Sequence, residues 1–550
     1  MAGIRPLTMS AISAVIAAWA YFGMPHAPIV VALAVLGIVA QFPHHIWRLL
    51  KSPRLSLFAS GSPAGTFIVP RAILAFAGYL VAQSSTLEVL WLIGFYFVLG
   101  AELTIRALAD RVVPVARNLP GYRLRDSLVL DPAWAYLISS LALLLWPLRD
   151  SFPWLHAGTT VMLAVAGLLT VFLIADASRL ILRRRATSTQ LQAALNAYEP
   201  RFLLHWQAPK GTSYQVSMWL PYLEQTGHPY FILLRSPENF DEIARLTNRP
   251  ILLRESLSTL DDVMVPSLHA ALYVNTATVN NHMVRYREVT HIQLNHGDSD
   301  KAPSYNPSFR AFDRNFVAGQ AAIDRFAANG ISTTSDFFEI VGRPQVASVQ
   351  LPVSPISAVS QPTVLYAPTW QGFYQDTDYS SLEFAEAIVQ TLLFEGYRVI
   401  FRPHPYSRKN QKHRPLIERV NAILAADPRD HVYGRAATEA EIFDLFNESD
   451  LLIADLSSVV SDYLASTKPI VLVRRETSED VSRTLGSACY ELDVASGTLD
   501  KTAFAGLLST IRADDPLSGR RTDVSAYYLS DVPAEGHAQL FVDTLDKYLS

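Results

Sequence analysis

Hydroxyl and carboxylate side chains follow a short apolar run in the segment LLIADLSSVVSDYL. Ser457 and Ser458 come directly after the run, and Asp462 follows one helical turn later. A helix that begins at Ser458 would carry free N–H groups and partial positive charge at its first turn. We therefore expect the two serines to contact a phosphate, and Asp462 to bind a ribose hydroxyl or to orient a neighbouring cation. The alternative is one N-cap serine beside a solvated aspartate.

Two histidines follow other apolar runs and could take part in acid–base chemistry or bind an anion. His404 lies between two prolines in RPHP, which should form a stiff extended loop that presents His404 and Arg402. His296 precedes Gly297, whose lack of a side chain lets a ligand approach the backbone closely. Because imidazole titrates near neutrality, His296 is the candidate general base. For each histidine the alternative is a structural role.

The triplet Asp298-Ser299-Asp300 behind His296 could bind a divalent ion through its two carboxylates. Such triplets are also common by chance, and we predict no metal and no other cofactor. The chain contains no CxxC, HExxH, Walker GxxxxGK[ST] or GxSxG motif. The candidate chemistry therefore depends on histidines, hydroxyls and the residues around them.

The elements that must position these residues are short strands separated by amphipathic stretches, from about residue 200 onward. The predicted strands are RFLLHW, PYFILL, ALYVN, HIQLNH, NFVAG, TVLYAP, RVIFRP, LLIAD and PIVLV. This alternation is typical of parallel sheets in α/β units. A Pro- and Ser-rich stretch, 342–362, indicates a linker between two Rossmann-like domains, 186–350 and 351–550. Ligands of such sheets bind at the carboxyl ends of strands, in a cleft between the two domains.

The first 185 residues have a different composition. Half of the chain is hydrophobic and only 17% is charged, which suggests a membrane part. We predict an α-helical transmembrane domain with about six spans, at residues 7–24, 27–43, 64–84, 86–105, 132–149 and 157–176. Arginines and lysines gather after the second, fourth and sixth spans, which predicts a multi-pass protein of the cell membrane with both termini and the catalytic part in the cytoplasm. Buried helices of a soluble domain are the alternative.

Length, net charge and cysteine content limit the number of domains, the partners and the cellular compartment to be expected. A chain of 550 residues is long enough for about three domains. Its net charge of −4 gives no reason to expect a nucleic-acid partner. The single cysteine, Cys489, excludes a disulfide within the chain, in keeping with a catalytic part in a reducing compartment.

Several segments together resemble the CDP-glycerol glycerophosphotransferase family, which includes teichoic-acid primases and polymerases with a GT-B-type fold. The segments are NHGDSDK (295–301), VGRPQV (341–346), YAPTW (366–370), RPHP (402–405) and DLSSVVSDYLASTKPIVL (455–472). The resemblance covers about residues 200–550. It implies that His404, Ser457, Ser458 and Thr369 contact a diphosphate.

The chain also departs from the family pattern. Gln371 replaces an arginine, Asn295 replaces a tryptophan, and Asp298-Ser299-Asp300 replaces Thr-Pro-Leu. Gln345 stands where the family has the arginine of its G-x-P-R segment. The side that would receive the acceptor is therefore altered more than the nucleotide side.

The resemblance implies a membrane-bound transferase that moves glycerol phosphate, or a related polyol phosphate, from a CDP-activated donor to a lipid-linked or cell-wall glycan acceptor. CMP is released, and His296 takes the proton of the attacking hydroxyl. The expected partners are CDP-glycerol, the acceptor and membrane lipids. One alternative is a GT-B glycosyltransferase that uses a sugar nucleotide. Another is a membrane scaffold with a degenerate nucleotide-binding domain.

Overall fold

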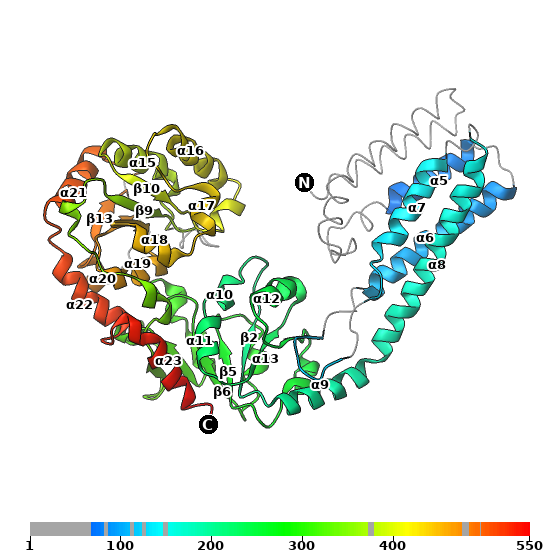
Figure 1. Cartoon of the computed structure of the whole chain (residues 1–550), viewed down its shortest axis with the longest axis horizontal. Helices are drawn as coiled ribbons and strands as arrows, with labels where there is room; N and C mark the ends of the chain where they lie inside the picture. Colours follow the sequence, from blue (N-terminus) through cyan, green and yellow to red (C-terminus); the bar gives the residue numbers. More distant parts are fainter. Residues whose placement is uncertain are drawn as a thin grey trace. The chain divides into compact units, whose positions relative to one another are not determined.

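The computed structural model describes residues 68–81, 86–109, 115–123, 128–146, 152–371, 379–475, 483–494 and 497–550. The chain divides into two compact units, residues 1–194 and 195–550. Figure 1 shows helices in the first unit and two sheets with their helices in the second.

The described part of the first unit is almost entirely helical. Its helices are α5 (Ile68–Val81), α6 (Thr86–Ala109), α7 (Ala133–Leu145) and α8 (Trp154–Leu182), and α9 (Arg184–Tyr198) runs across the boundary between the units. A two-residue strand, β1 (Ala116–Arg117), lies between α6 and α7 in the sequence. Helices α6 and α7 both pack against α8. Their shared core includes Trp91, Phe95, Trp146 and Leu163.

The predicted set of six membrane spans is not confirmed. The first two spans lie outside the described residues, and helices α5, α6, α7 and α8 lie at the other four positions. Among the described residues, two segments are long and apolar enough to cross a membrane, Thr86–Ile105 and Trp154–Leu182. The described residues of α5 number 14 and those of α7 number 13, and by themselves they extend about 20 Å, against about 30 Å for a bilayer core.

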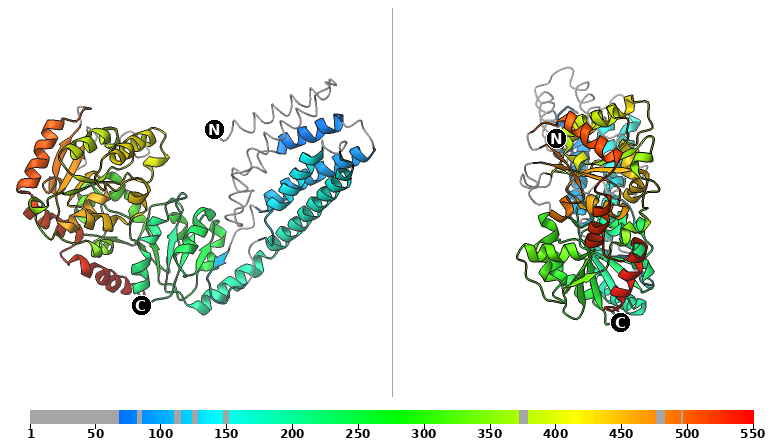
Figure 2. Two further views of the ribbon diagram at one scale, coloured as in Figure 1. Left: turned by 45° about the horizontal axis from the view of Figure 1, so that its top comes forward. Right: turned by 90° about the vertical axis from the view of Figure 1, so that its left-hand side faces the viewer.

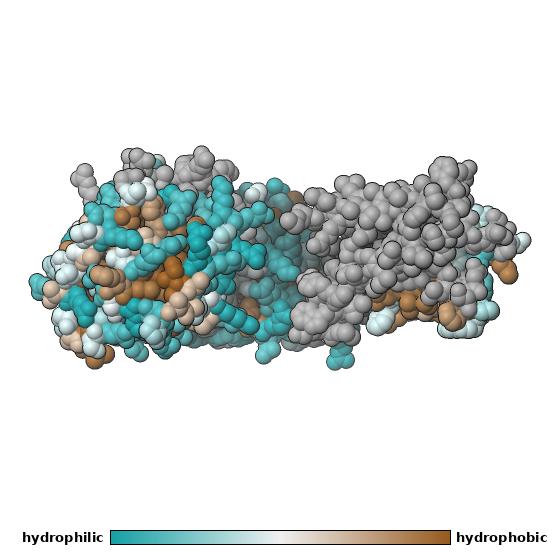
Figure 3. Space-filling model, turned by 90° about the horizontal axis from the view of Figure 1, so that it is seen from above, coloured by the Kyte–Doolittle hydropathy of each residue, from teal (hydrophilic) through white to brown (hydrophobic). Residues whose placement is uncertain are grey.

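The helices of this unit expose large apolar side chains outward and bury a polar group between them. Exposed positions include Leu90, Ile93 and Phe97 of α6 and Leu168, Val171 and Phe172 of α8. Hydrophobic surface is visible in brown at the right-hand end of Figure 3. Inside the unit, Arg71 Nη1 lies 2.7 Å from Glu102 Oε2, and Arg71 Nη2 donates to Ser139 Oγ at 2.7 Å. The ion pair links α5 to α6, and the bond to Ser139 links α5 to α7.

The first lobe of the second unit is built on a parallel sheet. Its strands are β2 (Phe202–Trp206), β3 (Tyr230–Leu234), β4 (Ile251–Leu253), β5 (Ala270–Tyr273), β6 (Thr290–Gln293), β7 (Arg314–Val317) and β8 (Phe338–Ile340). They lie in the order β4-β3-β2-β5-β6-β7-β8, with every neighbouring pair parallel. The helices of this lobe are α10 (Tyr214–Ser217), α11 (Leu220–Gln225), α12 (Phe240–Leu246), α13 (Asn280–Met283) and α14 (Gln320–Ala328).

The second lobe has a parallel sheet of its own. Strands β9 (Thr363–Ala367), β10 (Arg398–Phe401), β11 (Leu451–Asp455), β12 (Ile470–Arg474) and β13 (Tyr490–Asp493) lie in the order β10-β9-β11-β12-β13. Its first helices are α15 (Ala385–Phe394), α16 (His413–Ala426), α17 (Gly434–Glu439), α18 (Ile442–Glu448), α19 (Ser458–Tyr463), α20 (Arg483–Gly486) and α21 (Lys501–Ala513).

Alternate residues of the second sheet enter two different cores. Leu452 and Ala454 pack on one face, while Leu451 and Ile453 pack on the other. Helices cover both faces because central strands such as β9 and β11 are apolar and buried on both sides. The predicted pair of parallel α/β sheets, a GT-B-like arrangement, is confirmed.

The last two helices, α22 (Ser518–Leu529) and α23 (His537–Asp546), return from the second lobe to the first. Figure 2 shows them in red, beside the first lobe in both views. Helix α22 contacts α14, and α23 contacts α11. Phe541 of α23 packs against Trp219, with ring centroids 5.1 Å apart. The C-terminal helices therefore tie the two lobes together.

Candidate functional site

The predicted site residues lie after the carboxyl ends of four strands. His296 and Gly297 follow β6, and Thr369 follows β9. Arg402 and His404 follow β10, and the two serines follow β11. Since β10, β9 and β11 are neighbours in the second sheet, three of these segments meet at one sheet edge.

Gly297 brings the first lobe directly against the second. A Cβ atom placed on Gly297 would lie 2.9 Å from Ser458 Oγ and 3.0 Å from Ser458 Cβ, which is closer than real contacts allow. The absence of a side chain at this position is therefore what permits the loop after β6 to touch the start of α19. His296 and Ser458, far apart in sequence, become near neighbours in space.

Hydrogen bonding fixes the tautomer of His296. Its Nδ1 lies 2.6 Å from the carbonyl oxygen of Val274, so Nδ1 carries the proton and donates it. The other ring nitrogen, Nε2, then holds the lone pair. Burial lowers the pKa of His296 below 6.5, and the charge of Arg343 lowers it further, although the bond to Val274 acts in the opposite direction. The imidazole is therefore neutral at neutral pH and able to accept a proton at Nε2.

His404 has the opposite tautomer. Its Nδ1 accepts a hydrogen bond from the backbone N–H of Tyr406 at 3.2 Å, so in the neutral ring the proton is on Nε2. Burial lowers the pKa of His404 to about 4, with further lowering by Lys301, Arg402 and His296. This histidine is thus a neutral hydrogen-bond donor. The Trp370 ring stacks beside it, 6.1 Å between centroids.

Ser457, at the start of α19, does not cap the helix through its side chain. Ser457 occupies the N-cap position, but its side chain makes no capping hydrogen bond. Its Oγ is buried and has no hydrogen-bond partner in the described part of the chain. An unsatisfied buried hydroxyl is unfavourable by itself, so a ligand oxygen at this position would stabilise it.

Asp462 forms a buried ion pair with an arginine that the sequence analysis did not select. Arg343 Nε lies 2.9 Å from Asp462 Oδ1, and Arg343 Nη2 lies 3.2 Å from Oδ2. Burial raises the pKa of Asp462, whereas Arg343 lowers it. Asp462 thus contacts a neighbouring cation, and its binding of a ribose hydroxyl stays a prediction. The predicted alternative, a solvated aspartate, does not match because Asp462 is only 8% exposed.

Thr369 is held by the last residue of β11. Asp455 Oδ2 accepts hydrogen bonds from the backbone N–H groups of Thr369, at 2.7 Å, and Ser381, at 3.1 Å. Complete burial raises the pKa of Asp455 to about 6 despite these bonds and the nearby charge of Lys301. Lys301 Nζ lies 3.5 Å from Thr369 Oγ1. Asp455 thus shapes the loop after β9, and Lys301 reaches that loop from the first lobe.

Arg402 has a different position from the one expected. Its Nη1 donates to the carbonyl oxygens of Ala437 and Ala440, the latter at 2.6 Å. These carbonyls belong to the end of α17, where a cation is favourable. The guanidinium therefore stabilises the fold beside the RPHP loop and influences His404 through its charge.

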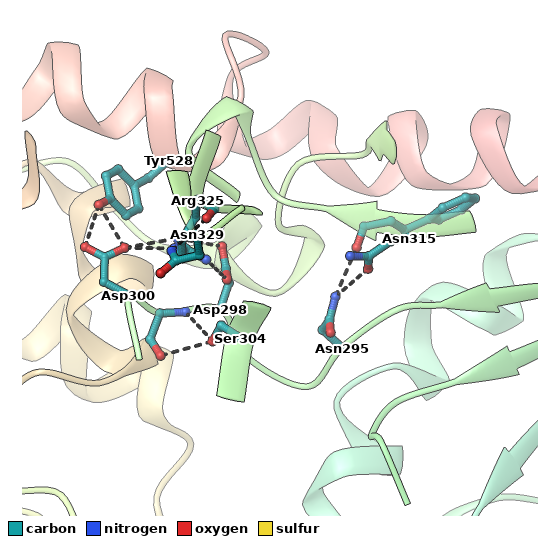
Figure 4. A network of polar contacts seen from close by, with 10 residues as sticks. Asn295, Asp298, Asp300, Ser304, Asn315, Arg325, Asn329 and Tyr528 are labelled. Carbon is teal, nitrogen blue, oxygen red and sulfur yellow. Dashed lines mark hydrogen bonds and ion pairs between the residues drawn. The ribbon is translucent and has the colours of Figure 1, made fainter. Parts of the chain in front are cut away.

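The acidic triplet after Gly297 is engaged by one guanidinium (Figure 4). Arg325 of α14 lies 2.6 Å from Asp298 Oδ1 and 3.1 Å from Asp300 Oδ1. Tyr528 of α22 donates to Asp300 Oδ2 at 2.8 Å. The triplet thus joins the loop after β6 to a helix of the first lobe and to a C-terminal helix.

Asn295 and Gln345, two positions at which the sequence departs from the pattern it resembles, also have defined contacts. Asn295 adopts a left-handed conformation, φ 61°, and donates to Asn315 Oδ1 at 3.0 Å. Gln345 Nε2 donates to the carbonyl of Met218 at 3.2 Å. Neither Arg343 nor Lys301 was selected from the sequence, although both lie inside the quoted segments VGRPQV and NHGDSDK.

Comparisons with known proteins give a family match over part of the second unit and several similar folds. Residues 353–483 match the family described as CDP-glycerol:poly(glycerophosphate) glycerophosphotransferase. No match was found among curated proteins. The matched segment contains Thr369, His404 and Asp462, and it supports a transferase of the glycerophosphotransferase type.

Solved structures with a similar fold include three at low sequence identity. The wall teichoic acid polymerase TagF is 14% identical, with 68% of this chain and 95% of that chain covered and a TM-score of 0.43. A UDP-N-acetylglucosamine 2-epimerase is 12% identical, covering 64% and 96%, with a TM-score of 0.42. Anabaena Alr3699/HepE, in complex with UDP and glucose, is 12% identical, covering 63% and 100%, with a TM-score of 0.41.

Proposed function

We propose that this chain transfers a polyol phosphate, with glycerol phosphate as the leading candidate, from a CDP-activated donor to a hydroxyl of a lipid-linked or cell-wall glycan acceptor. The observation that carries the proposal is the position and tautomer of His296. Its Nε2 is the proton-accepting nitrogen, on a loop that touches Ser458 of the other lobe. The family match over residues 353–483 supports the choice of donor.

In the proposed reaction the acceptor hydroxyl attacks the β-phosphorus of the donor. A bond forms between the acceptor oxygen and this phosphorus while His296 Nε2 takes the hydroxyl proton. The bond from the β-phosphorus to the bridging oxygen breaks, and its electron pair leaves with CMP. Phosphoryl transfer depends mainly on positioning and on stabilising charge, which suits a rigid base at the junction of two lobes.

The second lobe would hold the diphosphate through neutral donors. His404 presents Nε2–H, and Thr369, Ser457 and Ser458 present hydroxyls. Gly297 would let the substrate lie close to the backbone. Arg402 would keep the RPHP loop in place and contribute charge, while Asp462 would orient Arg343.

The proposal places the chain in the cell membrane, with several spans and with both termini and the two lobes in the cytoplasm. Large apolar side chains of α6 and α8 are exposed, and lipid chains would cover them. The arginines that follow the predicted spans suggest the orientation. In a Ser550→Cys variant, a membrane-impermeant maleimide should label residue 550 only after the cells are opened; labelling of intact cells would contradict this orientation.

The function is tested with full-length protein in membranes, supplied in turn with CDP-glycerol, CDP-ribitol and UDP-sugars. Release of CMP from CDP-glycerol that depends on added acceptor supports the proposal. Faster CMP release from CDP-ribitol than from CDP-glycerol would identify ribitol phosphate as the transferred group. Release of UDP from a UDP-sugar, with none from either CDP donor, would contradict the proposal and favour a glycosyltransferase.

A further inference from the structure

Lys301 is a cation at the junction of the lobes, and its role follows from the charge that the proposed donor brings. A nucleoside diphosphate ester is an anion, and catalysis of phosphoryl transfer requires positive charge near its phosphates. The hydrogen-bonding groups that the second lobe would offer to the phosphates are neutral. They are hydroxyls, and His404 with a pKa of about 4. Arg402 and Arg343 are bonded to carbonyls and to Asp462, respectively. A further cation near the neutral groups would therefore supply the positive charge that the phosphates require.

The position of Lys301 meets this requirement. It lies on the loop after β6 in the first lobe, yet its Nζ is 3.5 Å from Thr369 Oγ1 in the second lobe. The same Nζ is 4.8 Å from the centroid of the Tyr379 ring, a cation–π distance. Two groups of the second lobe thus hold the ammonium beside a residue that is expected to contact the diphosphate.

The loop that carries Lys301 is fixed by contacts outside the site. Arg325 binds Asp298 and Asp300, and Tyr528 binds Asp300. Ser299 N donates to Ser304 Oγ at 3.2 Å. Figure 4 shows the contacts of Asp298 and Asp300 with Arg325 and Tyr528, together with the contact at Ser304. Because the residue directly before Lys301 is anchored, the lysine side chain has a restricted range of positions.

We propose that the Lys301 ammonium binds the diphosphate of the CDP-activated donor, next to Thr369 and His404. The inference rests on the proposed function and adds a charged ligand from the first lobe to the neutral ligands of the second. A donor bound in this way is held by both lobes at once. The electrostatic influence of Lys301 on His404 and Asp455 agrees with this position.

A competing role for Lys301 is to balance the charge of the buried Asp455 carboxylate. In that role, loss of Lys301 would lower the stability of the protein without changing its preference for CDP over CMP. Affinities for CDP and CMP separate the two roles, since CDP has the second phosphate and CMP does not. The variants are Lys301→Met, which removes the charge, and Lys301→Arg, which keeps it. Lys501→Met is the matched control, because Lys501 lies at the start of α21 and its Nζ contacts Gln390.

For purified full-length protein in detergent, we expect Lys301→Met to weaken CDP binding about tenfold or more, the effect of a lost charged hydrogen bond, and CMP binding by far less. Lys301→Arg should recover most of the loss, and Lys501→Met should bind both nucleotides like the wild type. Equal losses for CDP and CMP, or none, would overturn the inference. If the wild type binds no CDP and releases no CMP, the proposed function fails as well.

A measurement on the wild type covers the case in which Lys301→Met does not fold. Acetylation of lysines with a water-soluble reagent, followed by mass spectrometry, should show slower modification of Lys301 in the presence of CDP than of CMP. Lys501 should be modified at the same rate in both. Equal rates at Lys301 with saturating CDP and CMP would contradict the proposal.

Discussion

At the scale of single residues, the two histidines of the site are distinguished by what their Nδ1 atoms contact. Nδ1 of His296 donates to a carbonyl, and Nδ1 of His404 accepts from a backbone N–H. One ring therefore presents a lone pair and the other presents a proton. Such a pair can remove a proton from one substrate and stabilise negative charge on another without either ring being charged.

The pH dependence of the reaction follows from this assignment. Because the pKa of His296 is lowered below 6.5, the base stays unprotonated at neutral pH and is lost only as the pH falls through that lowered value. We expect kcat/KM for CDP-glycerol to be flat near neutrality and to fall on the acid side, with a midpoint below about 6.5. A pH–rate profile tests this. A midpoint above 7 would show that His296 is not the base.

At the scale of secondary-structure elements, the acidic triplet holds the loop after β6 through a buried ion pair. Arg325→Met would leave Asp298 and Asp300 without their cation, which should destabilise the second unit by about 3–5 kcal/mol. The measurement is the free energy of unfolding in urea. Arg310→Met serves as a control, since Arg310 is exposed. Adding Asp298→Asn and Asp300→Asn to Arg325→Met should recover part of the loss; a further loss would contradict an ionic origin.

The sequence predicted the long apolar strands well, and it missed short or polar ones. β11 is apolar on both faces and ends in Asp455, so its position was evident. β4 has three residues, and β13 (YELD) alternates exposed and buried positions at the sheet edge, which makes such strands hard to separate from loops. Likewise the described residues of α5 and α7 are apolar, but they number 14 and 13, fewer than a bilayer span needs.

At the scale of the whole molecule, the site exists because the two lobes of the second unit meet. Gly297 touches Ser458, Arg343 pairs with Asp462, and Tyr528 bonds to Asp300. The sequence could identify His296, His404 and the serines from local patterns. It could not show that Arg343 faces Asp462 across 119 positions, because such a pairing depends on how the lobes pack.

The close contact between the two lobes can be tested by a substitution at Gly297. Gly297→Ala would place Cβ 2.9 Å from Ser458 Oγ, so Ser458 or the loop that carries His296 must shift. We expect kcat for CMP release to fall about 10²-fold, as for a misplacement of about 1 Å. Gly506→Ala is the control, because a Cβ at this helical position meets nothing within 4 Å. Unchanged kcat in Gly297→Ala would show that the contact does not position the base.

The most direct test of the account is CMP release from CDP-glycerol by His296→Ala, measured in the full-length protein with acceptor present. His228→Ala is the matched control, because His228 is partly exposed and pairs with Asp546 away from the site. We predict that His296→Ala lowers kcat about 10²–10⁴-fold while His228→Ala retains the wild-type rate. Wild-type turnover by a folded His296→Ala protein would contradict the assignment of this histidine as the base.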